Sequence, residues 1–203
     1  MDRISASPDQ TRDVYERQAA AYDAKRSRAL FEARWLARFS ACLPTGARVL
    51  DLGCGAGEPI ARWFIAEGFR VTGVDFAEPM LAIARARWPD GDWRHADMKQ
   101  LDLAETYDGI IAWDSFFHLR PDEQRTCIAH MARHLEPGGS LLLTVGPKAG
   151  EASGTVGGEP VYHASLSPAE YVACLEQNGL RLTGFLAEDP ETDKHSVLMA
   201  RKD

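Results

Sequence analysis

The stretch Val49-Leu-Asp-Leu-Gly-Cys-Gly-Ala-Gly57 decides how the rest of the sequence is interpreted. Its apolar residues predict a short buried strand, and its three glycines predict a sharp turn directly after that strand. Pro59 follows, and proline suits the first turn of a helix, where its missing N–H has no partner. Because the unpaired N–H groups at a helix start favour an anionic ligand group, we expect a binding loop at the carboxyl end of a strand.

An acidic residue at a second strand end indicates what this loop binds. Val71-Thr-Gly-Val-Asp75 is a short apolar stretch, and Asp75 lies 22 residues after Gly53. In βαβ nucleotide sites, about 20 residues separate the glycine loop from the carboxylate that binds a ribose diol. The alternative is that the glycine turn only packs a helix onto a sheet, but the spaced acid favours a binding site.

The glycines run G-x-G-x-G, and Asp51 stands two residues before the first of them. This pattern resembles the signature of class I S-adenosylmethionine (SAM) dependent methyltransferases more than the G-x-G-x-x-G/A of dehydrogenases. The resemblance covers roughly residues 48–202. It implies an α/β fold: a three-layer Rossmann-like sandwich whose seven-stranded, mostly parallel sheet has the order 3-2-1-4-5-7-6 and an antiparallel last strand. It also implies a single domain over residues 1–203, with an N-terminal helical lid at 1–45 and the core at 46–203.

Two further strand ends extend the cofactor site that the resemblance implies. The third predicted strand ends at Asp97, which would accept the adenine amino group, while the backbone N–H of Met98 would face a ring nitrogen. The alternative is that Asp97 only caps the turn that follows. The fourth predicted strand ends beside Trp113, where methyltransferases of this kind bring SAM and the methyl acceptor together.

Two helices are predicted before the first strand. Ser7-Pro-Asp-Gln10 is a capping box that begins the first helix, and the second is expected from about Ser27 to Cys42. The resemblance implies that such helices form a lid, with Tyr22 and Arg26 at the methionine end of SAM and Arg26 paired with its carboxylate. The alternative is a helix packed on the sheet edge with solvated arginines.

The helix after Asp75 supplies Phe76 and Met80, which are candidates for contact with the flat adenine face. Residues at helical spacing are often core residues, so a purely structural role remains open for both. The complete predicted cofactor set is Tyr22, Arg26, Asp51, Gly53, Cys54, Gly55, Asp75, Phe76, Met80, Asp97, Met98 and Trp113.

Candidates for the acceptor site follow the fourth and fifth strands. His118 is the first candidate for a general base, because an unperturbed histidine has a pKa near ~6.5, and His163 is the second. Trp113, His118 and Tyr162 are predicted to line the acceptor pocket. The alternatives are a structural His118 and a solvated flap in the polar segment that begins at Pro147. Two closing strands, near residues 180–186 and 195–200, are predicted to be antiparallel because a short turn joins them.

The composition narrows the function classes. The chain has 203 residues and a net charge of −7, which argues against a broad nucleic-acid-binding face. No apolar run approaches the ~20 residues that span a bilayer, and the polar first ten residues lack the apolar core of a signal peptide. The four cysteines are scattered without C-x-x-C spacing, so we expect reduced thiols in the cytoplasm and no metal site.

These patterns predict methyl transfer from SAM to an O, N or C nucleophile of a small organic molecule, with S-adenosylhomocysteine (SAH) as the product. The first alternative is a non-catalytic SAM-binding sensor. The second is an NAD-dependent oxidoreductase, against which the glycine spacing and Asp97 both speak. The sequence leaves open the identity of the acceptor and the oligomeric state.

Overall fold

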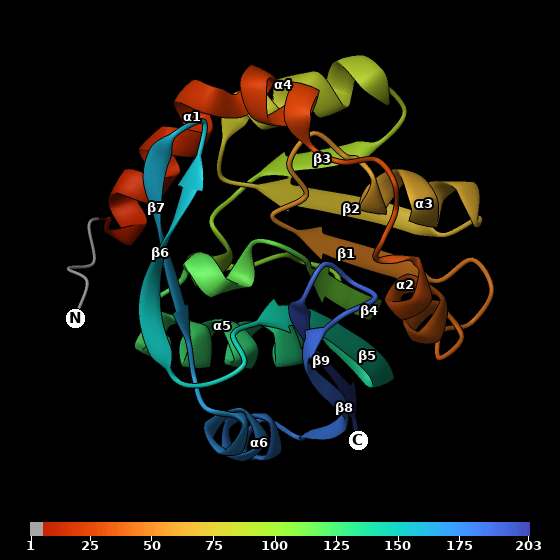
Figure 1. The fold of residues 1–203 in the computed structure, drawn as a ribbon. Coiled ribbons are helices and arrows are strands. Elements are labelled where there is room, and N and C mark those ends of the chain that lie inside the picture. The colour runs from red at the N-terminus through yellow and green to blue at the C-terminus, as the bar shows by residue number, and fades with distance from the viewer. Residues whose placement is uncertain (1–5) are drawn as a thin grey trace.

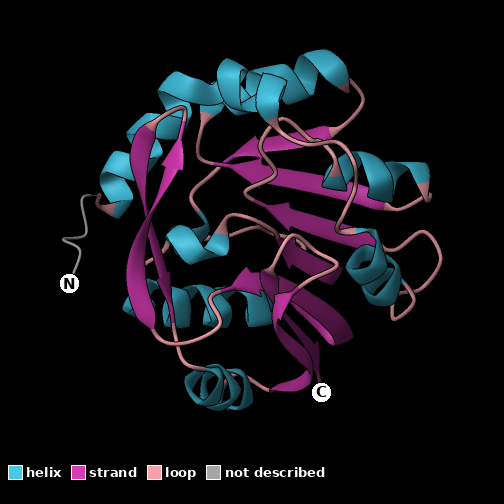
Figure 2. Cartoon of the chain, viewed as in Figure 1, coloured by secondary structure: helices cyan, strands magenta, loops and turns pink. Residues whose placement is uncertain are grey.

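The computed structural model describes residues 6–203, so the first five residues of the polar N-terminal stretch lie outside it. The strands are β1 Arg48–Leu52, β2 Arg70–Asp75, β3 Asp92–His95, β4 Tyr107–Ala112, β5 Leu135–Val145, β6 Gly150–Val156, β7 Glu159–Ser165, β8 Leu180–Asp189 and β9 His195–Lys202. Seven of them form one sheet in the order β3-β2-β1-β4-β5-β9-β8, and β6 pairs with β7 in a separate hairpin (Figures 1 and 2).

The direction of the strands follows the prediction. Strands β1 to β5 are parallel, β9 runs antiparallel to β5, and β8 runs antiparallel to β9. When the β6–β7 hairpin is left out, the order becomes 3-2-1-4-5-7-6. The predicted fold class and strand order are therefore confirmed.

Helices cover both faces of the sheet. They are α1 Pro8–Lys25, α2 Ala33–Ser40, α3 Ile60–Ala66, α4 Glu78–Arg87, α5 Pro121–His134 and α6 Pro168–Gln177. Alternate side chains of a strand point to opposite faces, so Val49 packs with Phe39 of α2 and Phe64 of α3. Its neighbour Leu50 lies in the other cluster, with Ile128 of α5 and the apolar face of α6. One apolar cluster therefore lies on each face of the sheet, between the sheet and the helices that cover it, which gives three layers: helices, sheet and helices.

The capping box predicted at Ser7 is confirmed, and Ser167 forms a second one at the start of α6. Ser7 accepts a hydrogen bond from the N–H of Gln10 at 3.3 Å, and Ser167 accepts one from the N–H of Glu170 at 3.3 Å. In each case the side chain at the third helical position also accepts a hydrogen bond from the cap N–H. Both helices therefore begin where their N-cap side chains satisfy otherwise unpaired donors.

Two elements differ from the prediction. The second helix is shorter than the expected Ser27–Cys42 because Leu30 has a φ of +52°, a left-handed conformation that no α-helix accommodates. The polar segment after Pro147 is not an irregular flap but the start of the β6–β7 hairpin, in which Val161 is fully buried. The hairpin is ordered because it packs on α1, where Val14 joins Val161 and Val156 in a small apolar cluster.

Helix α1 and the hairpin lie together beyond the carboxyl ends of the parallel strands (Figure 1). The hydroxyl of Thr11 accepts a hydrogen bond from the N–H of Tyr162 at 2.7 Å. Glu159 of β7 accepts hydrogen bonds from Arg17 at 2.6 Å and Gln18 at 2.8 Å. The two segments thus form one cover over the sheet edge. No helix within residues 6–203 combines the length and the apolarity needed to cross a membrane.

Candidate active site

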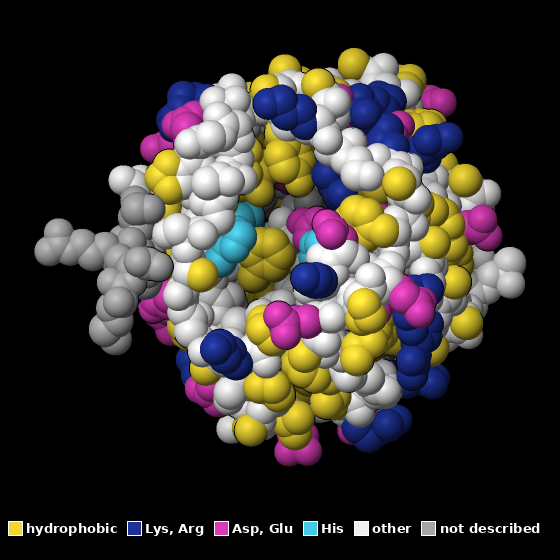
Figure 3. All heavy atoms as spheres, in the orientation of Figure 1, with side chains coloured by type: hydrophobic (Ala, Val, Ile, Leu, Met, Phe, Trp, Pro, Cys, Tyr) yellow, Lys and Arg dark blue, Asp and Glu magenta, His cyan; other side chains and the backbone are white. Residues whose placement is uncertain are grey.

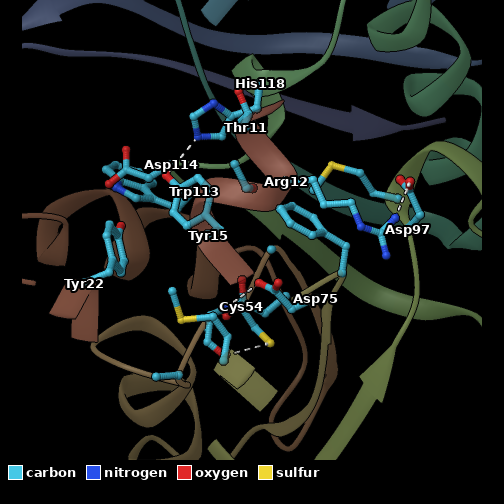
Figure 4. Close-up of a pocket in the computed structure, with 18 of the residues that line it drawn as sticks. Thr11, Arg12, Tyr15, Tyr22, Cys54, Asp75, Asp97, Trp113, Asp114 and His118 are labelled. Carbon is cyan, nitrogen blue, oxygen red and sulfur yellow. Dashed lines mark hydrogen bonds and ion pairs between the residues drawn. The ribbon is translucent and has the colours of Figure 1, made fainter. Parts of the chain in front are cut away.

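A cleft lies between the strand ends and helix α1. Gly53, Gly55, Asp75 and Asp97 all line it, so the loop and the two acids predicted from the sequence do converge on one space. Figure 4 shows Arg12 and Asp97 toward one end of the cleft and Tyr22 and Trp113 toward the other. All twelve predicted cofactor residues line this cleft: Tyr22, Arg26, Asp51, Gly53, Cys54, Gly55, Asp75, Phe76, Met80, Asp97, Met98 and Trp113.

Two glycines of the loop have different tasks. Gly53 has a φ of +76°, and a Cβ built there would lie 2.3 Å from the Cβ of Ser115, so only glycine allows the loop to approach the chain after β4. Gly55 has a φ of +53°, and a Cβ there would meet no atom within 4 Å. Since Gly55 lines the cleft, its missing side chain leaves room for a ligand.

Asp75 holds the glycine loop and the start of the next helix. One carboxylate oxygen accepts a hydrogen bond from the N–H of Gly55 and the other from the N–H of Ala77, each at 2.8 Å. A carboxylate has about four lone-pair sites, so these hydrogen bonds leave acceptor capacity for a ligand in the cleft. Burial raises the pKa of Asp75, and the backbone hydrogen bonds oppose this shift.

Asp51 is a second buried acid in the same cleft. Burial, followed by the charge of Asp75, raises the pKa of Asp51 to about 7. Within residues 6–203, neither Asp51 nor Asp75 makes an ion pair with a lysine or arginine. Buried acids without a cation are costly, so this end of the cleft favours a ligand that is positively charged.

Asp97, Arg12 and Phe76 lie together at one end of the cleft. Asp97 caps a short turn, where its Oδ1 accepts a hydrogen bond from the N–H of Lys99 at 2.9 Å. Capping was the alternative role weighed for this residue, and it does not exclude the adenine contact because Asp97 also lines the cleft. The guanidinium of Arg12 lies 5.5 Å from the ring centre of Phe76 and 4.0 Å from Asp97. The adenine role of Asp97 stays a prediction.

At the opposite end, Arg26 lies between two acids. Its Nη2 is 2.6 Å from Oε1 of Glu32, a fully buried residue, and 3.4 Å from Oδ2 of Asp114. Arg26 also lines the cleft beside Tyr22 and Trp113, so its predicted contact with a ligand carboxylate remains open. Oε2 of Glu32 has no hydrogen-bond partner among the described residues.

His118 is held at both ring nitrogens. Its Nδ1 lies 2.7 Å from the carbonyl oxygen of Tyr162, which only accepts, so this nitrogen carries the proton. Its Nε2 lies 3.0 Å from the hydroxyl of Tyr15, which must therefore donate to it. Burial lowers the pKa of His118 to about 4, so the ring is neutral. Neither ring nitrogen of His118 is therefore free to take a proton directly from a methyl acceptor. It is Tyr15, the hydrogen-bond partner of Nε2, whose hydroxyl stands between His118 and the cleft.

His195 forms a second histidine contact that the sequence analysis did not single out. Its Nε2 lies 2.7 Å from Oδ1 of Asp114, and its Nδ1 lies 2.7 Å from the carbonyl oxygen of Thr192. The ring stacks on Trp113 and on Phe31, with centroids 5.8 Å and 5.5 Å away. Burial opposes its charge, but Asp114, together with the Thr192 carbonyl and Asp193, raises the pKa of His195.

A second cavity of about 420 Å³ lies beside the cleft, between the hairpin and the turn before β9. Phe117, His163 and His195 line it. Figure 3 shows this face hollowed at its centre, with histidine side chains beside the hollow and a hydrophobic side chain within it. The two cavities share a wall, because the rings of His163 and His118 are 5.0 Å apart and His195 contacts Asp114.

The predicted acceptor residues are distributed over this wall. Trp113 and His118 line the cleft, and His163 lines the second cavity. The ring of Tyr162 lies on the other side of the hairpin, packed with Ala6 and Ala164, because neighbouring residues of a strand point to opposite faces. Tyr162 reaches the site through its carbonyl oxygen.

Three site residues were missed, and the sequence held signals for them. Tyr15 is seven residues before Tyr22, which places both on one side of a helix. Asp114 directly follows the fourth strand, at the edge where the other acids lie. His195 begins an antiparallel strand, and the start of such a strand meets the carboxyl ends of its parallel neighbours.

Comparison with known proteins agrees with this geometry. A family model described as a methyltransferase domain matches residues 49–139. The chain is 32% identical over 169 residues to the ubiquinone biosynthesis O-methyltransferase of Xanthomonas axonopodis pv. citri, and this match covers 71% of the chain and 68% of that protein. The chain belongs to the class I SAM-dependent methyltransferase family.

Shorter matches connect the chain to methyltransferases with different substrates. It is 33% identical to dTDP-4-amino-2,3,4,6-tetradeoxy-D-glucose N,N-dimethyltransferase of Saccharopolyspora spinosa over 50% of the chain and 41% of that relative. It is 38% identical to trans-aconitate 2-methyltransferase of Azoarcus sp. over 50% of the chain and 40% of that relative. The chain thus spans about two fifths of the length of these relatives.

Solved structures share the fold of this methyltransferase chain. A SAM-bound amino pentose methyltransferase from Micromonospora echinaspora aligns with a TM-score of 0.72 at 22% identity, covering 92% of the chain and 96% of that structure. The 1,6-didemethyltoxoflavin-N1-methyltransferase of Burkholderia thailandensis aligns with a TM-score of 0.72 at 24% identity, over 100% and 93%. Within the described residues, no three His, Cys, Asp or Glu side chains form a group that could hold a metal ion.

Proposed function

We propose that this protein is an enzyme that transfers the methyl group of SAM to an O, N or C nucleophile of a small organic molecule and releases SAH. The observation that supports this most directly is the convergence of Gly55, Asp75 and Asp97 on one cleft. Gly55 leaves space for a ligand at the loop, Asp75 offers acceptors for a ribose diol, and Asp97 offers an acceptor for an exocyclic amine.

The cleft residues suggest how the cofactor would be oriented. Asp97, Met98 and Phe76 would contact the adenine, and Asp75 the ribose. Tyr22, Arg26 and Trp113 would then surround the methionine end, with Arg26 facing its carboxylate. When bound, SAM supplies a cationic sulfonium whose methyl is electrophilic, so no metal is required. The unpaired acids Asp51 and Asp75 favour this sulfonium cation over SAH, whose thioether sulfur is uncharged.

The protein's own part in the reaction would be to position the nucleophile against the methyl group and to exclude water from the site. A nucleophile held about 3–3.5 Å from the methyl and in line with the breaking bond reacts far faster than one free in solution. Helix α1, at residues 8–25, and the hairpin would act as the lid predicted for the N-terminal segment. We assign His118 the role of orienting the hydroxyl of Tyr15 at the cleft, through the hydrogen bond of 3.0 Å.

Calorimetric titration with SAM, SAH and NAD tests the proposal against its alternatives. We expect SAM and SAH to bind, SAM more tightly, and NAD to show no saturable heat. NAD binding without SAM binding would instead indicate an oxidoreductase. SAM binding with no methylated product from any compound of a broad metabolite collection would favour a sensor.

A further inference from the structure

We propose that the second cavity binds the methyl acceptor, that Nε2 or Nδ1 of His163 takes the acceptor's proton, and that the acceptor is a compact planar molecule with an acidic O–H or a heteroaromatic N–H. This inference rests on the proposed function and adds to it the class of acceptor and the residue that deprotonates it. Four observations support it: the size and place of the cavity, the free imidazole, the ring-lined walls and the charge balance.

The cavity has a suitable size and place. Its volume of about 420 Å³ falls in the range of roughly 300–1,000 Å³ that small-molecule sites occupy. The wall that separates it from the cofactor cleft is made of side chains, through the contacts of His163 with His118 and of His195 with Asp114. An acceptor bound in this cavity would extend between these side chains into the cleft, so that its reacting atom comes within about 3–3.5 Å of the methyl carbon.

His163 is the imidazole in this wall that can accept a proton. Both nitrogens of His118 make hydrogen bonds, and the two nitrogens of His195 lie 2.7 Å from Oδ1 of Asp114 and 2.7 Å from the carbonyl oxygen of Thr192. Within residues 6–203, neither nitrogen of His163 makes a hydrogen bond, and the centre of its ring lies 4.7 Å from that of Phe117 and 5.0 Å from that of His118. Burial lowers the pKa of His163, so the ring is neutral and its lone pair is available at neutral pH.

The charged groups around His163 do not change its neutral state. The carboxylate of Asp114, at the end of β4, favours the protonated ring but is outweighed by burial. From the three-ten turn η2, Phe116–His118, the ring faces neutral His118. Across the cavity lie His195 from β9 and the rim residues Lys148 and Glu151.

The shape and charge of the lining indicate the class of acceptor. The rings of Phe117, His163 and His195 present flat surfaces, which suit a planar molecule. The ionisable groups that line the cavity carry both signs, the cations Lys148 and Lys194 beside the acids Glu151, Glu188 and Asp193. A neutral acceptor is therefore favoured over a strongly charged one.

The proposed step is balanced. The lone pair of the acceptor's oxygen or nitrogen forms a bond to the methyl carbon, while the carbon–sulfur bond breaks and its electron pair stays on sulfur. The proton of the acceptor moves to the free nitrogen of His163. A weakly basic imidazole suits a phenolic, enolic or heteroaromatic proton much better than the proton of an aliphatic alcohol.

The test uses the full chain, SAM and matched acceptors. Phenol, 4-hydroxycoumarin and benzimidazole carry acidic protons, whereas cyclohexanol and cyclohexylamine have similar size without that acidity or planarity. Methylated product and SAH are measured by mass spectrometry. We expect transfer to at least one acidic probe and none to cyclohexanol. Transfer only to cyclohexylamine, or SAM binding with no transfer to any acidic probe, would overturn the assignment of acceptor class.

Variants separate the base from a merely structural side chain. His163→Phe keeps a ring against Phe117, and we expect its turnover at neutral pH to fall about 10²- to 10⁴-fold with an unchanged SAM dissociation constant. The deficit should shrink as the pH rises and the acceptor ionises without help. His163→Gln, which keeps a polar side chain, provides a second measurement if the first variant unfolds. Turnover within threefold of wild type in a folded variant would remove His163 from the reaction.

A pair of matched substitutions on β6 tests the cavity itself. Ala152 lines the cavity and pairs with His163 across the hairpin, whereas Thr155 lies further along the same strand and does not line it. Ala152→Trp should raise the acceptor KM at least tenfold, and Thr155→Trp should leave it unchanged. Equal effects of the two would place the acceptor elsewhere. If the wild-type chain does not bind SAM at all, the proposed function itself is refuted. Calorimetry distinguishes this outcome from those that concern only the acceptor cavity or His163.

Discussion

Replacement of Asp75 by asparagine tests the centre of the predicted cofactor site. The carboxylate accepts one hydrogen bond from Gly55 and one from Ala77, each at 2.8 Å, and it lines the cleft with acceptor capacity left for a ligand. Asparagine has a single acceptor oxygen, and its amide N–H₂ would face one of the two backbone donors. The substitution therefore removes contacts both with the loop and with a bound ribose.

The magnitude follows from these contacts. A hydrogen bond to a charged group is worth about 1.5–3 kcal/mol, so Asp75→Asn should weaken SAM binding about 10- to 150-fold. The unpaired backbone donor should also lower the free energy of unfolding by about 1–3 kcal/mol. Calorimetry at a temperature where the variant is fully folded separates the two effects.

A control and a modified ligand isolate the ribose contact. Asp92 of β3 also accepts two partners, Thr72 and Arg94, but it does not line the cleft. Asp92→Asn should leave SAM affinity unchanged. Wild-type protein should bind 2′,3′-dideoxy-SAH more weakly than SAH, and Asp75→Asn should bind both alike, as a double-mutant cycle requires. SAM affinity within twofold of wild type for folded Asp75→Asn would refute the ribose assignment.

Three further predictions concern the loop and the two paired histidines. Gly55→Ala places a methyl group in the open cleft at a φ of +53°, so SAM affinity should fall at least tenfold. Gly53→Ala would collide with Ser115 in the chain after β4, so the thermal midpoint of this variant should fall further than that of Gly55→Ala. The pKa of His118 is about 4 in the folded protein, below the ~6.5 of the unfolded chain. The free energy of unfolding should therefore fall by about 3 kcal/mol as the pH drops from about 6.5 to 4. In denaturant titrations, His118→Asn should flatten this dependence on pH. The pKa of His195 is raised, so its stabilising contribution is complete below pH ~6.5 and is lost as the pH rises through the folded pKa; His195→Gln should abolish this alkaline loss.

Each of these has a contrary outcome. Equal thermal midpoints for the two glycine variants would contradict the different surroundings of Gly53 and Gly55. A wild-type stability that stays constant between pH 6.5 and 4, or an acid slope unchanged in His118→Asn, would mean that His118 is not the buried neutral group described. An alkaline slope that persists in His195→Gln would assign that slope to another group.

The strand ends show how far the sequence alone reaches. The residues that follow each predicted strand, at Gly53, Asp75 and Asp97, do lie in one cleft, because parallel strands end at the same sheet edge. The strand order came from the family resemblance, and the antiparallel closing pair came from a short connection. The second helix was predicted to begin too early: the left-handed backbone at Leu30, which no hydrophobic pattern marks, prevents a helix from running through that residue, and α2 begins at Ala33.

The sequence by itself determined the binding loop, the acids beside it and the class of fold, because these depend on spacing within one βαβ unit and its neighbours. Only the tertiary structure decided which histidines are free. Tyr15 and His118 are separated by 103 residues, and their hydrogen bond exists because the hairpin brings a carbonyl oxygen to the other side of the ring. The hydrogen-bonding state of a side chain depends on every segment packed around it, and for this site those segments come from both ends of the chain.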